Sequence, residues 1–468
     1  IHVKKADKVI LTLQDETDNM LMDGEPYADT SADAPTAAVF SMGGLTINGG
    51  GSLHVFGNAA GGIASRDRLV IAGGLIRVQA ADDGIVGRDL AAVKGGHVVV
   101  SAGGDGIKST NDEDGGRGNI AIAGGKIAIT SGGDGMQAAA DLAMVGGELE
   151  IVAGGGSAAG APGDDEASAK GLKAARNLFI SGGAIRIDAA DDALHSDGGL
   201  FISGGAFTLA TGDDAIHADS VVHITDGSID IAASYEGIEA TDITVSGGTI
   251  RVVSRDDGIN IAGSGDDAAA SSAVRNRNGA PGGTLTISGG YIVVDASGDG
   301  LDANGSIVMT GGTVIVNGPT DEGNAALDYD RTFRISGGVL AAAGSARMAQ
   351  APSDDSEQAS VFIMFRNTME AGTLVSLHDS GGNTVFAFAP SKPFRTLVVS
   401  APNLKEGETY TIMAGGSHDG AAMDGLYEDG TATGGMPVAS FRMDGRTTHA
   451  GGTGAQGGRF GGREGGRP

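Results

Sequence analysis

Carboxylates that recur at a fixed spacing are the residues of this chain best placed to do chemistry. They stand in four strings, Asp191-Asp192-Ala193-Leu194-His195, Asp213-Asp214-Ala215-Ile216-His217, Tyr235-Glu236-Gly237-Ile238-Glu239 and Asp256-Asp257-Gly258-Ile259-Asn260. The second residues of the strings lie 22, 22 and 21 residues apart. A fixed period of this length is typical of stacked supersecondary units. The spacing therefore predicts that these carboxylates lie one above another in the folded chain.

The same period extends the strings into two predicted columns. The corner column is formed by the second residue of each string and its equivalents, Asp83, Asp105, Asp134, Lys170, Asp192, Asp214, Glu236, Asp257, Asp299 and Glu322. The outward column lies three residues further on and consists of Lys108, Gln137, Lys173, His195, His217, Glu239, Asn260 and Asp302. Stacked strands are about 4.8 Å apart, so members of one column are expected to be direct neighbours.

Like charges at this separation need compensation, because each pair of neighbours repels by about 1 kcal/mol even in water. Ca²⁺ is the expected counterion, since it takes six to eight oxygen ligands in flexible geometry. The tightest predicted oxygen-only cluster is Asp214, Glu236, Glu239 and Asp257, with a neighbouring cluster of Asp191, Asp192 and Asp213. The full set of predicted calcium ligands is Asp82, Asp83, Asp105, Asp112, Asp114, Asp134, Asp191, Asp192, Asp213, Asp214, Glu236, Glu239, Asp256, Asp257, Asp299 and Asp302. The alternative is that each aspartate is a turn former that binds a backbone N–H.

Four basic or imidazole side chains of the outward column are candidates for contacting a ligand: Lys108, Lys173, His195 and His217. A Zn²⁺ site at the two histidines would need two more nitrogen or sulfur ligands at a compatible spacing. The sequence offers none, so exposed, hydrogen-bonding histidines are the favoured interpretation.

The elements that position these residues can be read from residues 200–220. Three short runs with apolar residues at every second position are separated by Gly or Asp corners, which predicts three strands in one unit. Three strands and three corners in about 22 residues predict a right-handed parallel β-helix of about twelve rungs. The predicted inward-facing residues of this rung are Ile202, Phe207, Leu209, Ile216 and Ala218.

Outside the repeats the composition changes. Residues 1–42 contain a single alternating apolar run, and the repeat stops near residue 345, where ordinary strand patterns predict a small antiparallel β cap or sandwich. From residue 445 the chain is rich in Gly and Arg and is expected to be disordered. The predicted organisation is an entry strand and cap over 1–42, a parallel β-helix over 43–345, a C-terminal β cap over 346–444 and a tail over 445–468.

Composition restricts the partners. The chain has 31 Lys and Arg against 59 Asp and Glu, a net charge of −28, which argues against nucleic acid as a partner. It contains no cysteine and therefore no disulfide framework. No uninterrupted apolar stretch of about 18 residues is present, so no membrane span is expected.

The corner strings resemble those of a known family, the secreted bacterial proteins described as carbohydrate-binding domain-containing. The similarity covers about residues 1–440. The strings that carry it are Asp-Asp-Gly-Ile at 82–85 and 256–259, Gly-Gly-Asp-Gly-Ile-Lys-Ser-Thr-Asn-Asp-Glu-Asp at 103–114, Asp-Asp-Ala-Leu-His at 191–195, Ser-Tyr-Glu-Gly-Ile-Glu at 234–239 and Ser-Gly-Asp-Gly-Leu-Asp at 297–302. The resemblance implies a calcium-binding right-handed β-helix of pectate-lyase-like architecture, secreted or at the cell surface, that associates with plant cell-wall polysaccharides such as cellulose or polygalacturonate.

Among the glycans, an acidic one is favoured. A cellulose-binding surface usually stacks sugars on coplanar aromatic rings, whereas this chain has no Trp and six scattered Tyr. A polyuronate can be held by calcium ions shared between its carboxylates and those of the protein. The sequence therefore predicts a calcium-dependent binder of acidic polysaccharide such as polygalacturonate.

Two alternatives from other classes stay open. One is a structural adhesin or filament subunit, because a β-helix presents open strand edges at its ends and can assemble end to end. The other is a calcium-dependent polysaccharide lyase. A lyase needs a base, and acidic neighbours of Lys108 and Lys173 raise a lysine's pKa, so we favour binding over catalysis.

Overall fold

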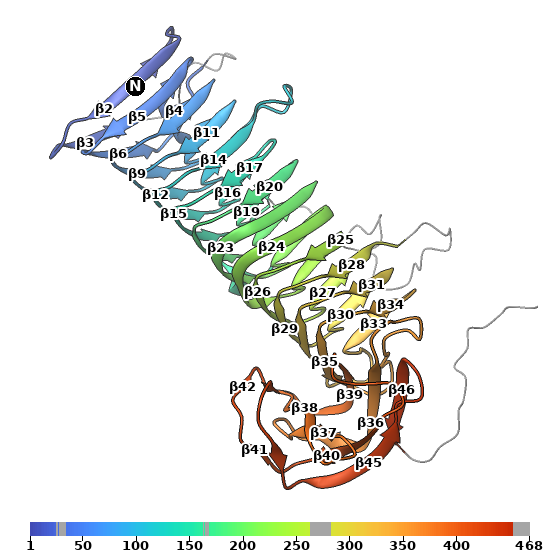
Figure 1. Cartoon of the computed structure of the whole chain (residues 1–468). Coiled ribbons are helices and arrows are strands. Elements are labelled where there is room, and N and C mark those ends of the chain that lie inside the picture. Colours follow the sequence, from blue (N-terminus) through green and yellow to red (C-terminus); the bar gives the residue numbers. More distant parts are fainter. Residues whose placement is uncertain (25–26, 28–33, 162, 164–167, 263–281, 453–468) are drawn as a thin grey trace, which may run out of the picture.

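The computed structural model describes residues 1–24, 27, 34–161, 163, 168–262 and 282–452. Their strands wind into an elongated rod that carries a smaller β unit at its C-terminal end (Figure 1). Three strands and three corners form each turn of the rod. The chain is thus a parallel β-helix with a C-terminal cap, as predicted from the repeat.

Strands of successive turns pair in parallel, which gives the rod three long faces. The first sheet contains β1 (His2–Val3), β4 (Ala37–Ser41), β7 (Gly61–Ser65), β10 (Ile85–Gly87), β13 (Ile107–Lys108), β16 (Met136–Ala138), β19 (Leu172–Ala174), β22 (Leu194–Ser196), the starts of β24 (Ile216–Ser234) and β25 (Ile238–Val245), β27 (Ile259–Ile261), β30 (Leu301–Ala303) and β33 (Leu327–Tyr329). The second sheet contains β2 (Lys8–Leu13), β5 (Gly44–Gly49), β8 (Arg68–Ile71), β11 (Leu90–Val93), β14 (Asn119–Ile122), β17 (Leu142–Met144), β20 (Asn177–Ile180), the start of β23 (Gly199–Thr211), parts of β24 and β25, β28 (Thr284–Ile287), β31 (Ser306–Met309) and β34 (Phe333–Ile335). The third sheet contains β3 (Asp18–Met22), β6 (Ser52–Gly57), β9 (Leu75–Ala80), β12 (His97–Ala102), β15 (Lys126–Ser131), β18 (Glu148–Ala153), β21 (Ala184–Ala189), the ends of β23 and β24, β26 (Thr249–Ser254), β29 (Tyr291–Ala296), β32 (Thr313–Asn317) and β35 (Val339–Gly344).

Each sheet has thirteen strands in the described residues, so the rod has thirteen rungs where about twelve were expected. The additional rung is formed by β1, β2 and β3, which lie in the stretch predicted to be an entry strand and cap. They pair in parallel with β4, β5 and β6. The segment between β3 and β4 is longer than an ordinary corner, which hides the rung from a search for the 22-residue period.

The core follows the alternation of the strands. Ile202, Phe207, Leu209, Ile216 and Ala218, the residues predicted to point inward, are all at most 3% exposed. Phe201, Thr208 and His217, which alternate with them along the strands, are less buried, as expected for strands whose successive side chains point to opposite faces. The same alternation brings the outward column to the outer surface of the first sheet.

The corner between the second and third sheets requires glycine. Gly248, the second residue of its Gly-Gly pair, has φ +84°, and a Cβ there would lie 2.8 Å from the carbonyl oxygen of Gly227 one rung before. Gly227 has φ +118°. Residues other than glycine rarely adopt this left-handed conformation, so the second glycine of the repeated pair is a backbone requirement of the stack.

The C-terminal unit is built from antiparallel strands, as predicted. Its strands are β36 (Ser360–Met369), β37 (Val375–His378), β38 (Thr384–Phe388), β39 (Phe394–Ser400), β40 (Thr409–Ala414), β41 (Ser417–His418), β42 (Ala422–Met423), β43 (Leu426–Tyr427), β44 (Ala432–Thr433), β45 (Met436–Arg442) and β46 (Thr447–Gly451). β39 pairs antiparallel with β35, which joins the unit to the last rung. The exception is β46, which pairs in parallel with β36. It lies inside the stretch predicted to be a disordered tail, because its Thr-Thr-His-Ala sequence suits a strand. Residues 453–468 lie outside the described residues.

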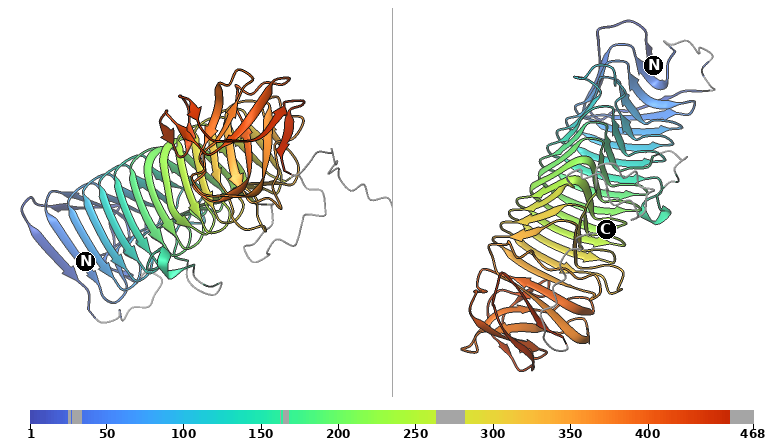
Figure 2. Two further views of the ribbon diagram at one scale, coloured as in Figure 1. Left: turned by 90° about the horizontal axis from the view of Figure 1, so that it is seen from below. Right: turned by 90° about the vertical axis from the view of Figure 1, so that its right-hand side faces the viewer.

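The C-terminal unit also covers the outside of the third sheet at its last rungs, and Figure 2 shows it at one side of the rod's end. Val293, Ile315 and Ala341 point outward from β29, β32 and β35 and form a second core with Val361 and Leu377 of the unit. These three strands are buried at consecutive positions, whereas burial alternates along earlier strands of the sheet such as β12 and β15. Strands buried on both faces read as continuous apolar runs.

The C-terminal end of the rod is partly covered by the chain that follows it. The segment after the last rung covers β34, where the N–H of Ser353 donates to the carbonyl oxygen of Phe333 and the N–H of Phe333 donates to the hydroxyl of Ser353. β39 covers the edge of β35. Two of the three strands of the last rung, β34 and β35, are therefore already bonded at the edge that end-to-end stacking would use.

Among the described residues the sole helical element is the 3₁₀ turn η1 (Ser157–Ala159). None of the described helical structure has the length and apolarity to cross a membrane.

Candidate metal centre

The strand register places the two columns as predicted, with one exception. Asp83 and its equivalents through Asp299 stand at the same position before successive strands of the first sheet. The exception is Glu322, because Leu301 pairs with Leu327 and the corner position after Asp299 is consequently Ala325. The prediction of Glu322 was wrong because this rung carries extra residues before its corner, which a count from the preceding glycines does not detect.

The outward column lies in the first sheet itself. Lys108 pairs with Gln137, which pairs with Lys173, and the series continues in register through His195, His217, Glu239, Asn260 and Asp302. One further member, Asp328, follows Asp302. The two columns run side by side along one edge of the rod.

Each corner aspartate uses one carboxylate oxygen to hold the next rung. The backbone N–H of Asp105 donates to Asp83 Oδ1 at 2.9 Å, and that of Asp134 donates to Asp105 Oδ1 at 2.8 Å. The N–H of Asp299 donates to Asp257 Oδ1 at 2.6 Å. The turn-former alternative thus explains one oxygen of each aspartate, with the N–H coming from the next rung. The second oxygen faces the outward column and remains to be neutralised.

In the N-terminal half of the columns, lysines neutralise the second oxygens. Lys108 Nζ lies 2.7 Å from Asp105 Oδ2 and 3.4 Å from Asp83 Oδ2. Although burial of Lys108 lowers its pKa, the two carboxylates raise that pKa above its usual value. Lys173 Nζ lies 3.8 Å from Asp134 Oδ2.

Lys170 stands within the corner column and occupies the predicted cluster of Asp191, Asp192 and Asp213. Its Nζ lies 2.7 Å from Asp191 Oδ1 and 2.6 Å from Asp192 Oδ2, and its side chain is 14% exposed. The three carboxylates do converge, with one oxygen from each within 4.8 Å of the others. An ammonium group already supplies a positive charge there, which reduces the need for a metal ion.

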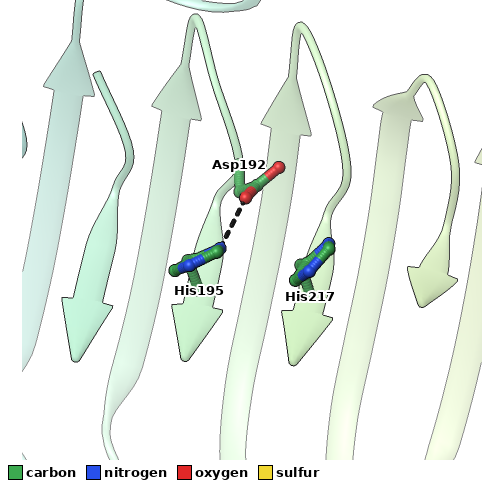
Figure 3. A group of neighbouring side chains, drawn as sticks. All are labelled: Asp192, His195 and His217. Carbon is green, nitrogen blue, oxygen red and sulfur yellow. Dashed lines mark hydrogen bonds and ion pairs between the residues drawn. The ribbon is translucent and has the colours of Figure 1, made fainter. Parts of the chain in front are cut away.

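The two histidines lie on neighbouring rungs with their rings stacked, 5.0 Å between centroids (Figure 3). His195 Nδ1 contacts Asp192 Oδ2 at 2.8 Å, and His217 Nδ1 contacts Asp214 Oδ2 at 3.1 Å. Their side chains are only 13% and 23% exposed. The histidines are thus hydrogen-bonded as expected but largely buried, because they stack on each other and lie between acidic side chains.

Neighbouring charges and hydrogen bonds shift the pKa values of Asp192 and His195. Burial raises the pKa of Asp192, but the hydrogen bond from His195 and the charge of Lys170 outweigh burial and hold it well below its usual range. Burial lowers the pKa of His195, but its bonds to Asp192 and Asp197 outweigh burial and raise it. Asp197 was not predicted as part of the site; the signal is the Asp-x-x-His-x-Asp spacing, which recurs as Asp214, His217 and Asp219.

Beyond His217 the columns contain carboxylates without a cationic partner. Asp257, Asp299 and Asp302 each contribute an oxygen to a group in which all donor atoms lie within 4.8 Å. Burial and the charges of Asp299 and Glu236 raise the pKa of Asp257 to about 8. Burial and the charges of Asp257 and Asp299 raise the pKa of Asp302 to about 8. In the described part of the chain, no lysine or arginine forms an ion pair with any member of this group.

Glu236 and Glu239 extend this uncompensated section. Burial and the charge of Glu239 raise the pKa of Glu236 to about 8, and burial and the charge of Asp214 raise that of Glu239 to about 8. The predicted four-carboxylate cluster is nevertheless divided, because Asp214 and Glu239 gather around His217 whereas Asp257 belongs with Asp299 and Asp302.

The group of Asp257, Asp299 and Asp302 fits Ca²⁺ in its donor chemistry. All its donors are carboxylate oxygens, which hard cations prefer. The side-chain oxygen of Asn260 is buried without a hydrogen-bond partner, and Asn260 stands between Glu239 and Asp302 in the outward column. Amide oxygens are common calcium ligands. A buried acceptor without a donor, next to carboxylates without a cationic partner, is the arrangement expected at a cation site.

The remaining predicted calcium ligands lie outside these groups. Asp82 is exposed beside Asp83, and Asp256 hydrogen-bonds Tyr235. Asp112 and Asp114 are exposed in the loop between β13 and β14, where Asp114 pairs with Arg117 at 3.1 Å.

A short row of aromatic rings on the second sheet was not predicted. Phe179 and Phe201 stack at 5.1 Å between centroids, and His223 follows at 5.5 Å from Phe201. Their positions are one rung apart in the register. Because the two phenylalanine rings are nearly parallel to each other and stacked along the rod, their facing surfaces are covered, and the row offers less of the flat ring surface on which sugars stack.

Comparisons with known proteins relate the chain to proteins described by a carbohydrate-binding domain. A family model described as "Carbohydrate-binding domain-containing protein" matches residues 1–215 and 215–323. A protein of Acetivibrio thermocellus with the same description is 40% identical over 82 residues, which is 17% of this chain and 29% of the relative's length. The solved structure titled "Structure of the polysaccharide lyase-like protein from C. thermocellum, Gadolinium derivative" matches at 30% identity and a TM-score of 0.34, covering 38% of this chain and 67% of that one.

Proposed function

Because the chain belongs to the family of carbohydrate-binding domain-containing proteins, we propose that it is an extracellular, calcium-dependent binder of acidic polysaccharide such as polygalacturonate. Calcium is held at Asp257, Asp299 and Asp302, and a uronate carboxylate of the glycan completes the coordination of the ion. The observation that carries the proposal is the uncompensated section of the columns, where converging carboxylates have no cationic partner among the described residues.

The charge of the protein determines how such a glycan can bind. At a net charge of −28, the protein repels a polyanion unless cations lie between the two. The three protein carboxylates have six oxygens, but Asp257 Oδ1 and Asp299 Oδ1 already accept backbone N–H groups of the next rung. The four remaining oxygens are fewer than the six to eight that Ca²⁺ takes. Coordination positions are therefore left for the carboxylates of a ligand that runs over the outer face of the first sheet.

Lysines of the two columns do not provide such a binding surface by themselves. Lys108 is paired with Asp83 and Asp105, and Lys170 with Asp191 and Asp192. Their charges are already balanced within the protein. The carboxylates of an acidic glycan consequently find their positive charge at bound calcium.

The test is retention of the protein on insoluble polygalacturonate in millimolar calcium and in chelator. We expect retention that requires calcium and that falls at least about tenfold in the Asp257→Asn/Asp302→Asn double variant, since two of three ligands lose their charge. The matched control is Glu150→Gln/Asp230→Asn, which removes two exposed acids from the third sheet and should leave retention unchanged.

Two results would contradict the proposal. One is equal retention with and without calcium, or of the double variant and the wild type. The other is formation of unsaturated uronate product during the assay, measured by its absorbance, which would replace binding by lyase activity.

A further inference from the structure

His217 differs from an ordinary hydrogen-bonded histidine because carboxylates face both of its ring nitrogens. Nδ1 lies 3.1 Å from Asp214 Oδ2 and 3.6 Å from Glu239 Oε2, and Nε2 lies 3.4 Å from Asp219 Oδ1. Asp214 is buried, and Glu239 is 17% exposed in its side chain. A neutral imidazole has one N–H donor and one lone pair. If Nε2–H points to Asp219, the Nδ1 lone pair faces oxygens of both Asp214 and Glu239, and a cation between them would bond to all three atoms.

The preceding rung contains the same motif with that positive charge already supplied. His195 contacts Asp192 through Nδ1 at 2.8 Å and Asp197 through Nε2 at 3.0 Å, as His217 contacts Asp214 and Asp219. There Lys170 Nζ binds the same Asp192 oxygen at 2.6 Å. No described lysine or arginine forms an ion pair with Asp214 or Glu239.

The donor set of the His217 rung favours a transition metal over calcium. Asp214, His217 and Glu239 each offer one atom, and all three atoms lie within 4.8 Å of one another. One nitrogen and two carboxylate oxygens suit Zn²⁺ and its neighbours in the first transition series, whereas Ca²⁺ takes oxygen ligands. Asp219 stands where a carboxylate that orients a ligating histidine is usually found, at the ring nitrogen away from the metal.

We propose that Asp214, His217 and Glu239 form a second metal site, which binds a divalent transition-metal ion through two carboxylate oxygens and His217 Nδ1. Asp219 is a positioning residue that holds the ring from Nε2. With three protein ligands, the ion keeps a position open to solvent or to a donor atom of a bound molecule. The site is distinct from the oxygen-only group of Asp257, Asp299 and Asp302 and does not depend on glycan binding.

The experiment is a titration of untagged, full-length protein with Zn²⁺ in competition with a chromogenic chelator, in the presence of millimolar calcium. We expect one Zn²⁺ per chain. His217→Gln should abolish stoichiometric binding, and Asp219→Asn should weaken it by about 10–100-fold, the usual effect of removing a partner that orients a ligand. His195→Gln is the matched control, because it removes the equivalent histidine of the lysine-neutralised rung, and it should keep binding within a few-fold.

A spectroscopic readout separates ligation from a general effect on folding. Co²⁺ added in place of Zn²⁺ should give visible ligand-field absorption that His217→Gln removes and His195→Gln preserves, with both variants folded by circular dichroism. The Asp257→Asn/Asp302→Asn variant should bind Zn²⁺ like the wild type, so a failure of the calcium proposal leaves this one intact. No Zn²⁺ binding, binding that survives His217→Gln, or equal loss in His195→Gln would overturn the assignment.

Discussion

The uncompensated carboxylates predict a specific dependence of local stability on pH in calcium-free protein. Asp257 and Asp302 have pKa values raised to about 8 in the folded chain, chiefly by burial and then by neighbouring carboxylates, against about 3.9 when unfolded. Between these two values the folded chain retains protons that the unfolded chain has lost. The stabilisation is therefore complete below about pH 4 and is lost as the pH rises toward 8.

The magnitude follows from the number of protons retained. Each retained proton changes the free energy of opening by about 1.4 kcal/mol per pH unit, which is about tenfold in the opening constant. Because Asp257, Asp299 and Asp302 interact, one shared proton is the minimal expectation. Calcium should remove this dependence, since the ion replaces the proton as the positive charge among the carboxylates.

Amide hydrogen exchange is a suitable assay, because a rod of stacked rungs can open locally. The reporters are the N–H groups of Gly300 and Leu301, which bond Ala325 and Ala326 of the next rung. From pH 5 to 8 in chelator, their protection factors, corrected for intrinsic rates, should fall about tenfold per pH unit. The control is the equivalent pair, Gly106 and Ile107, where Lys108 neutralises the adjacent aspartates. A pH-independent reporter, or an equal slope at both places, would refute the reasoning.

Two further predictions concern single residues of the columns and of the rod. Lys170→Ala should lower the unfolding free energy by about 3–5 kcal/mol, because it leaves Asp191 and Asp192 without their buried cation. The control Lys126→Ala, which breaks an exposed pair with Glu148, should cost at most about 1 kcal/mol. Equal effects of the two variants in urea unfolding would contradict the role of Lys170. Gly258→Ala should lower the unfolding free energy by about 1–3 kcal/mol through overpacking, since the added Cβ would lie 2.2 Å from Val294 Cγ1 and 2.6 Å from the carbonyl oxygen of Gly300. A midpoint of thermal unfolding equal to that of the wild type would contradict this prediction and show that the rung can expand.

Much of the architecture is encoded in the sequence period, because a parallel stack turns sequence spacing into spatial neighbourhood. The alternation in residues 200–220 identified the inward-facing Ile202 and Leu209, and the 22-residue spacing placed His195 beside His217. The period fails where the spacing changes. Extra residues before Ala325 displaced Glu322 from the corner column, and the long segment before β4 concealed the first rung.

The sequence did not predict which sections of the columns are neutralised by lysines and which are not. Lys170 is visible there as a basic member of the corner column, but its reach to both Asp191 and Asp192 depends on the direction of its side chain. The outward column already placed Glu239 beside His217, but its charge led to its grouping with Glu236 and Asp257. That its carboxylate lies with Asp214 and His217 depends on the direction of the side chain. The apolar outer face of β29, β32 and β35 is visible in the sequence, but its partner lies in a separate unit of the chain.

The most direct test of the central claim is a crystal structure of the protein grown with calcium, with anomalous scattering used to locate the ion. The account predicts an anomalous peak at about 2.3–2.6 Å from oxygens of Asp257, Asp299 and Asp302, the usual calcium–oxygen distance, and none between Asp191 and Asp192, where Lys170 lies. A calcium peak beside Lys170, or an ordered site at Asp257, Asp299 and Asp302 without calcium at saturating concentration, would contradict it.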